Sequence, residues 1–151
     1  MSREFNNDVI LDAAAFDVLD RSDGESLREL MRTTWKNEGE VKTAAVTLAE
    51  VCRGTARTRR VEAILARQYD GRTIAIVGTD AELAKMVGGI LFGAKVDSSM
   101  IVDGYAVAVA ALTSAFAIVV TADPDDIARL AAQVPGVRIV TRSPRAVAAS
   151  R

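Results

Sequence analysis

Histidine is absent from this 151-residue sequence, and Cys52 is its only cysteine. Histidine is the commonest general base in enzymes, so that role is not available here. Its absence also excludes Ser-His and Cys-His nucleophile pairs and metal sites built on histidine. A single cysteine excludes a structural zinc cluster and an intrachain disulfide, which fits a reducing, cytoplasmic setting. Carboxylates, hydroxyls, lysine and arginine remain for catalysis, and carboxylates select hard cations such as Mg²⁺ or Mn²⁺.

Signals for export, membranes and a strong charge bias are also missing. The polar residues 1–8 have no apolar core, so no secretory signal is expected. The uncharged run 104–120 is shorter than the roughly 20 residues that a membrane span needs, and it contains Thr113 and Ser114. We therefore expect a buried helix, a turn and a buried strand there. The net charge of −1 means that a polyanion would need a local basic patch.

Short apolar runs alternate with helical patterns along the chain. The expected buried strands cover residues 9–11, 41–46, 73–77, 117–120 and 137–140. This alternation predicts an α/β fold, a three-layer α/β/α sandwich with a mainly parallel sheet of four or five strands. We expect one domain over residues 1–151, with its core at about residues 8–140. No GxGxxG or Walker A loop is present, so nucleotide-cofactor signatures are absent.

Four acids are placed where strands end and helices begin. Asp12 and Asp123 each follow an expected strand, whereas Glu50 and Asp103 are expected early in helices. In a parallel sheet all these positions share one edge, so we expect the four side chains to converge. Converging carboxylates repel one another and raise their pKa values, and a divalent cation would remove that cost.

Three of these acids also have simple structural explanations. Glu50 completes a capping-box pattern with Thr47 at the expected start of a helix. Asp103 in a first helical turn favours the helix dipole. Asp123 can cap the helix that Pro124 begins. The sequence taken residue by residue leaves these alternatives open.

One stretch of the chain is strongly basic. Residues 53–72 contain six arginines, which only Glu62 and Asp70 oppose: Arg53, Arg57, Arg59, Arg60, Arg67 and Arg72. Such a run is usual for a solvated helix face. It also suits phosphate contact, because the guanidinium group is planar and binds in a bidentate manner. In the same part of the chain we expect Tyr69, together with Trp35, to anchor helix packing rather than to stack on bases.

The acids lie within motifs that resemble a known family. The segments "VILDAAAF", "TLAEVCRG", "IVDGYAVAVA" and "IVVTADPDDIARLA" resemble, in order and rough spacing, those of the PIN-domain ribonucleases. Within that family they resemble in particular the toxins of VapBC-type toxin–antitoxin pairs. The resemblance covers about residues 8–140, and "TADPDDIARLA" is its strongest piece.

This resemblance implies an endoribonuclease that depends on Mg²⁺ or Mn²⁺ and hydrolyses RNA phosphodiesters. The catalytic and metal-binding acids would be Asp12, Glu50, Asp103 and Asp123, and Thr121 matches a hydroxyl often found beside the last of them. The basic stretch supplies candidate RNA contacts: Arg53, Arg57, Arg59 and Arg60. The resemblance also implies a homodimer and a cognate antitoxin whose C-terminal segment blocks the acidic groove.

The sequence departs from the family near two of the acids. Relatives usually have a hydroxyl or glycine shortly after the first acid, where this chain has Ala13, Ala14 and Ala15. Many relatives have a polar residue one turn before the third acid, where this chain has Met100. Thinner support around metal ligands weakens affinity or activity by about 10–100-fold. The alternative function is therefore a weak or inactive PIN-like module that binds RNA or a protein partner. A receiver-like domain is disfavoured, because its usual lysine after a late strand has no clear counterpart.

Overall fold

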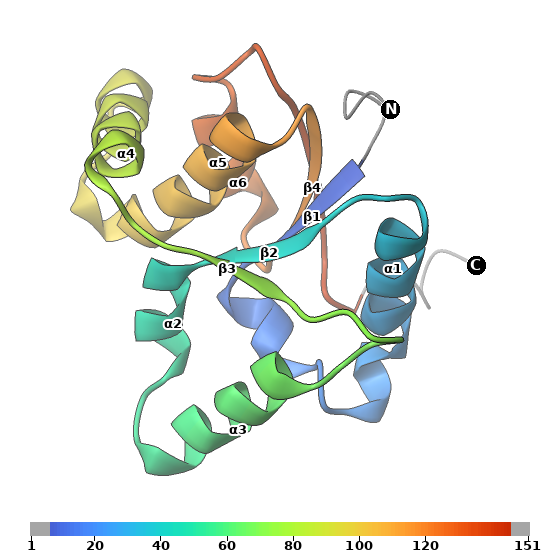
Figure 1. Ribbon diagram of the computed structural model, residues 1–151. Coiled ribbons are helices and arrows are strands. Elements are labelled where there is room, and N and C mark those ends of the chain that lie inside the picture. Colours follow the sequence, from blue (N-terminus) through green and yellow to red (C-terminus); the bar gives the residue numbers. More distant parts are fainter. Residues whose placement is uncertain (1–6, 146–151) are drawn as a thin grey trace.

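The structure, a computed structural model, describes residues 7–145 and is built on a five-stranded sheet (Figure 1). The strands are β1 (Asn7–Leu11), β2 (Val41–Ala44), β3 (Ala75–Val77), β4 (Phe116–Val120) and β5 (Arg138–Arg142). They lie in the order β3-β2-β1-β4-β5, and every neighbouring pair is parallel. The predicted α/β fold with a parallel sheet is confirmed.

Helices cover both faces of the sheet. One face is covered by α4 (Ala81–Ala94), α5 (Ile101–Thr113) and α6 (Pro124–Ala131), and the other by α1 (Glu25–Lys36) and α3 (Thr55–Ala66), as Figure 1 shows. The short helix α2 (Ala45–Val51) follows β2 directly. Three short 3-10 turns complete the described elements: Ala13–Asp17, Ser22–Gly24 and Ser98–Met100.

The core consists of two apolar clusters, one on each face of the sheet. Within β1, Ile10 packs into the cluster under α4, α5 and α6, whereas Val9 and Leu11 pack into the cluster under α1 and α3. All three side chains are fully buried. This alternation follows from the two-residue period of a strand, and burial on both faces explains why the run is continuously apolar.

The predicted capping box at Thr47 is wrong. β2 ends at Ala44, where its pairing with β3 also ends, and α2 begins at Ala45. Thr47 is therefore inside the helix and fully buried, and its hydroxyl has no hydrogen-bond partner. Glu50 consequently lies in the last turn of α2 and not near the start of a helix. Alanine is the strongest helix former, so the chain turns into a helix sooner than the apolar run suggests.

Helix α1 begins without a side-chain cap. Ser22 and Asp23 lie in a 3-10 turn, and Gly24 takes the cap position. A β-carbon on Gly24 would lie 2.0 Å from the carbonyl oxygen of Val18, so this close approach requires glycine. Helix α3 ends at Ala66, before the arginine-rich stretch is complete.

Asp80 caps α4, since its Oδ1 accepts a hydrogen bond from the Leu83 N–H at 2.8 Å. Helix α4 passes through Gly93 and ends only where Lys95 adopts a left-handed conformation, with φ at 58°. The run 104–120 forms most of α5 and then β4, as predicted. Within residues 7–145, no helix is long and apolar enough to cross a membrane.

Candidate active site

The sheet has a topological switch point at β1, because β2 and β4 pair with its two opposite edges. Open α/β sheets form a crevice at such a point, outside the carboxyl ends of the strands. Asp12 directly follows β1, and Asp123 follows β4 closely. A cleft of about 530 Å³ is present there, and Glu50 and Asp103 line it together with these two acids. The structure therefore brings all four candidate acids to one cleft.

Asp12 is the most firmly held of the four acids, with only 4% of its surface exposed. Its Oδ1 accepts a hydrogen bond from the Ala13 N–H at 2.9 Å, and its Oδ2 accepts one from the Thr121 hydroxyl at 2.8 Å. The Thr121 Oγ1 in turn accepts a hydrogen bond from the Asp123 N–H at 3.0 Å. Thr121 is buried and so joins the first and last acids of the set.

The acids also influence one another electrostatically. Burial raises the pKa of Asp103 to about 7, and the charges of Asp12, Asp123 and Asp126 add to this effect. Burial likewise raises the pKa of Glu50, with further contributions from Asp12 and Asp123. Each raised pKa means that a further negative charge in the cleft is unfavourable, so a bound cation would stabilise the ionised carboxylates.

The structural explanations for these acids weaken once their positions are known. Glu50 is exposed and lies in the last turn of α2, so it caps nothing at the start of that helix. Asp123 occupies the N-cap position of α6, but its side chain makes no capping hydrogen bond. Asp103 does lie in the first turn of α5, so a favourable interaction with that helix dipole remains.

Sequence reasoning missed two further acids and one hydroxyl residue that line the cleft: Asp17, Asp126 and Ser99. Asp126 was detectable, because it follows Asp123 by three residues and the two share a helix face. Asp17 carried no such signal, since the 3-10 turn that brings it back beside Asp12 has no clear sequence marker.

Apolar side chains also line this cleft. Ala13 and Ala14 line it beside Asp12, and Met100 lines it near Asp103. Apolar groups therefore occupy these positions in the lining of the cleft. Hydrogen-bonding support for water or substrate is reduced at these points.

Arg57 and Arg60, both in the basic stretch, make different contacts in the structure. Arg57 lines the cleft, where its Nη2 lies 3.7 Å from Asp17 Oδ1, and both side chains are about half exposed. Arg60 instead binds Asp20 through two hydrogen bonds, of 2.7 and 2.8 Å, and donates a third of 2.7 Å to the carbonyl of Asp17. Arg60 therefore ties α3 to the segment after β1, while Arg57 remains loosely paired.

The other two candidate arginines lie outside the cleft lining. Arg53 donates a hydrogen bond from Nε to the carbonyl of Ala49 at 2.9 Å. Arg59 is exposed on α3 and does not face the acids. Of the four arginines predicted to contact RNA, only Arg57 shares the cleft with the carboxylates.

The chemistry of this cleft fits a hard divalent cation. All its candidate ligands are carboxylate oxygens, which Mg²⁺ and Mn²⁺ prefer. Within residues 7–145, however, no three acidic or cysteine side chains are arranged so that they could hold an ion directly. Mg²⁺ commonly keeps several waters and binds through only one or two carboxylates. A wide acidic cleft thus fits an ion held largely through water.

The fold has a counterpart among solved structures. No family model and no curated protein matches this sequence. A chain in the crystal structure of VapBC2 from Rickettsia felis, bound to a DNA fragment from its promoter, superposes with a TM-score of 0.59. The alignment covers 89% of this chain and 98% of the other. The fold is PIN-like. The identity is 14%, so the likeness establishes the PIN-like fold and not the chemistry.

Proposed function

We propose that this protein is a Mg²⁺- or Mn²⁺-dependent endoribonuclease and the toxin of a toxin–antitoxin pair. The observation that carries the proposal is the meeting of Asp12, Glu50, Asp103 and Asp123 in one cleft at the switch point of a PIN-like sheet. The superposition with a VapBC2 chain over nearly its whole length supports the same family of functions. The lack of histidine agrees with a reaction that rests on carboxylates.

The four acids divide into rigid and adjustable ligands. Asp12 is fixed by Ala13 and Thr121, and Thr121 also fixes the backbone at Asp123. Each carboxylate oxygen of Asp12 keeps one lone pair free for a metal ion or its water. A divalent cation held there would supply an activated water and neutralise charge on the phosphate. Glu50, which is exposed, can adjust to the ion and substrate.

An acidic cleft repels RNA, so a cationic group at its edge is needed as well as the metal. Arg57 fits this role, because it lines the cleft and its pairing with Asp17 is loose and open to solvent. Exposed pairs of this kind contribute only about 0–1 kcal/mol, so a phosphate can replace Asp17 at little cost.

The proposed partners are an antitoxin and a second copy of this chain. The neighbouring structure contains a VapBC2 assembly, which supports an antitoxin partner. We propose that the C-terminal segment of the antitoxin blocks the acidic cleft and that the toxin is a homodimer.

The test compares cleavage of a structured RNA pool by the wild type, Asp12→Asn and Asp125→Asn, with Mg²⁺, Mn²⁺ or EDTA. Asp125 is a matched control, because it is exposed in the first turn of α6 and does not line the cleft. We expect cleavage only with a divalent ion, its loss in Asp12→Asn and its retention in Asp125→Asn. Cleavage that survives in Asp12→Asn, in a protein with unchanged melting temperature, would refute the metal site.

The second candidate function is an RNA- or protein-binding module without catalysis. The observation that favours it is the apolar lining by Ala13, Ala14 and Met100 in a cleft without a ready-made group of three ligands among the described residues. This function predicts RNA binding that EDTA does not alter and no cleavage with any divalent ion.

A further inference from the structure

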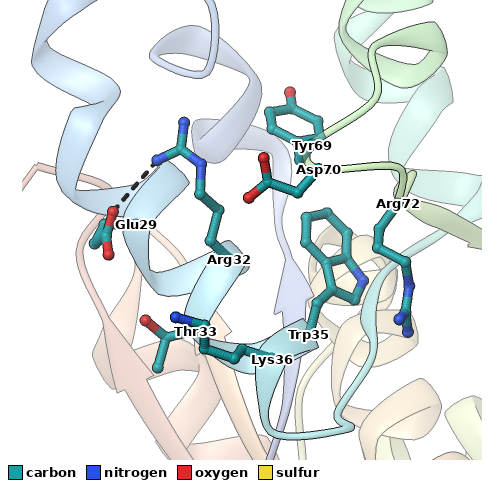
Figure 2. A pocket seen from close by; sticks show the side chains of 8 residues that line it. All are labelled: Glu29, Arg32, Thr33, Trp35, Lys36, Tyr69, Asp70 and Arg72. Atoms are coloured by element: carbon teal, nitrogen blue, oxygen red, sulfur yellow. Dashed lines mark hydrogen bonds and ion pairs between the residues drawn. The ribbon is translucent and has the colours of Figure 1, made fainter.

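A second pocket lies apart from the acidic cleft, between α1 and the turn that follows α3 (Figure 2). Its volume is about 320 Å³, which is within the range of small-molecule sites. Its lining is Glu29, Arg32, Thr33, Trp35, Lys36, Tyr69, Asp70 and Arg72. The C-terminal end of α1 and the segment before β3 both lie toward the amino ends of the parallel strands. The pocket is therefore at the opposite edge of the sheet from the four acids.

The wall of this pocket is aromatic and firmly built. Trp35 and Tyr69 are 7% and 3% exposed, and their ring centroids are 5.7 Å apart. Their burial confirms the predicted packing role. The segment Tyr69–Arg72 is closed by two backbone hydrogen bonds, of 2.7 and 3.1 Å, around Asp70 and Gly71, which both have positive φ. This Asp-Gly turn is of the tight type that such residues favour, so it holds Asp70 and Arg72 in place.

Several polar groups in the pocket have no partner among the residues that the structure describes. Within residues 7–145, the cationic ends of Lys36 and Arg72 form no ion pair, and the indole N–H of Trp35 donates no hydrogen bond. Figure 2 shows the indole nitrogen on the side of the ring that faces Arg72. The carboxylate of Asp70, from the same turn as Arg72, adds an acceptor beside Tyr69. Lys36, Asp70 and Arg72 are exposed, so their charged ends are accessible to a ligand. In the same pocket the buried hydroxyl of Tyr69 has no hydrogen-bond partner within residues 7–145. Buried polar groups normally find partners, so the hydroxyl together with the accessible charges indicates a ligand.

We propose that this pocket binds a nucleotide, with its base stacked on the exposed guanidinium group of Arg72 beside the aromatic wall and its phosphate at Lys36. A nucleotide combines a planar base, an anionic phosphate and base N–H groups that can donate hydrogen bonds to Asp70. Arginine stacks on planar groups, and lysine binds phosphate as a point charge. The ligand is a free nucleotide or one unit of an RNA strand. This inference does not depend on the nuclease proposal, because none of the four acids lines this pocket.

Trp35 is the only tryptophan in the chain, so its fluorescence reports on this pocket alone. The experiment titrates the full chain, in EDTA, with AMP, GMP, CMP and UMP, and then with a short oligoribonucleotide. We expect a saturable fluorescence change with at least one nucleotide. Lys36→Gln and Arg72→Gln should each weaken binding by about tenfold, the effect of losing one charge-assisted contact. Lys85→Gln is the charge-matched control on the exposed face of α4 and should bind as the wild type does.

The same titration distinguishes a free nucleotide from a nucleotide unit of an RNA strand. An oligoribonucleotide that binds more than tenfold tighter than its mononucleotides identifies RNA as the ligand, and equal affinities identify a free nucleotide. The absence of any saturable change up to millimolar nucleotide would overturn the proposal. It would also be overturned if inorganic phosphate produced the same change, or if an acidic peptide bound where nucleotides did not. Asp12→Asn should leave the titration unchanged, so failure of either proposal can be recognised separately.

Discussion

At the scale of single residues, the acids show what a sequence can and cannot reveal. Asp12 and Asp123 were predictable, because each follows an apolar run that is recognisable as a strand. Asp17 was not, because a short 3-10 turn determines its place in the cleft. The end of a buried strand can be recognised from the sequence. The path of a short irregular turn depends instead on tertiary packing, which the residues of the turn do not encode.

Asp103 gives a prediction about stability and pH. In the folded protein its pKa is about 7, above the ordinary value of 3.8, so the folded state keeps a proton that the unfolded chain releases between these values. Stability contributed at this site therefore falls as pH rises from about 4 to about 7. Without divalent ions, Asp103→Asn should raise the free energy of unfolding by about 1–3 kcal/mol at pH 8, after allowance for solvent screening.

The gain from Asp103→Asn should be less than half as large at pH 5, where the native carboxyl is already protonated. Chemical denaturation at the two pH values measures both effects, and Asp125→Asn controls for the change in net charge, because Asp125 lies outside the cleft. An equal gain at both pH values would show that packing, and not charge, is responsible.

At the scale of elements, α2 was the least predictable part of the site. The pattern Thr47-Leu48-Ala49-Glu50 has the form of a helix start, yet the helix begins at Ala45. The end of β2 is set by its neighbours, since pairing with β3 stops at Ala44. The pairing of β2 with β3, and not the capping-box pattern, therefore determines where the helix begins. The convergence of Glu50 on the cleft was predicted, but through the wrong position within its helix.

Helix α3 gives a prediction that separates two neighbouring arginines. In an Asp12→Asn background without cleavage, Arg57→Gln should weaken RNA binding several-fold and flatten the log–log salt dependence by about 0.7, the effect of one lost contact to a single strand. Arg60→Gln should leave that slope unchanged but reduce the free energy of unfolding by about 1 kcal/mol, because it removes the bonds to Asp20 and Asp17.

Arg59→Gln is the control for charge in this comparison, because Arg59 is exposed on the same helix and outside the cleft. Filter binding at several salt concentrations and urea denaturation supply the two measurements. If Arg59→Gln flattens the salt dependence as much as Arg57→Gln, RNA lies along the outer face of α3 and not in the cleft.

At the scale of the whole molecule, the fold was predictable because its strands are short, apolar and separated by helical patterns. The order of the strands was not, since apolar periodicity does not say which strand lies beside which.

One polar network lies where three distant segments meet. Lys42 Nζ lies 3.0 Å from Asp8 Oδ2 and donates to Thr113 Oγ1 at 2.8 Å, and the Ser114 hydroxyl donates to Asp8 at 2.6 Å. This network joins β1, β2 and the segment before β4.

The Asp8–Lys42 pair therefore gives a prediction about the stability of the whole fold. Both side chains are nearly fully buried, at 2% and 3% exposed, so Lys42→Met leaves an uncompensated carboxylate in the interior. It should reduce the free energy of unfolding by about 3–5 kcal/mol. Adding Asp8→Asn to Lys42→Met should recover part of that loss, because the stranded charge is then removed. Arg145→Ala breaks the exposed pair with Asp23 and should cost at most about 1 kcal/mol. Urea denaturation of the four proteins measures these differences. If the double variant were less stable than Lys42→Met alone, the cost would lie in lost packing and hydrogen bonds, and the buried charge would not be what holds the three segments in register.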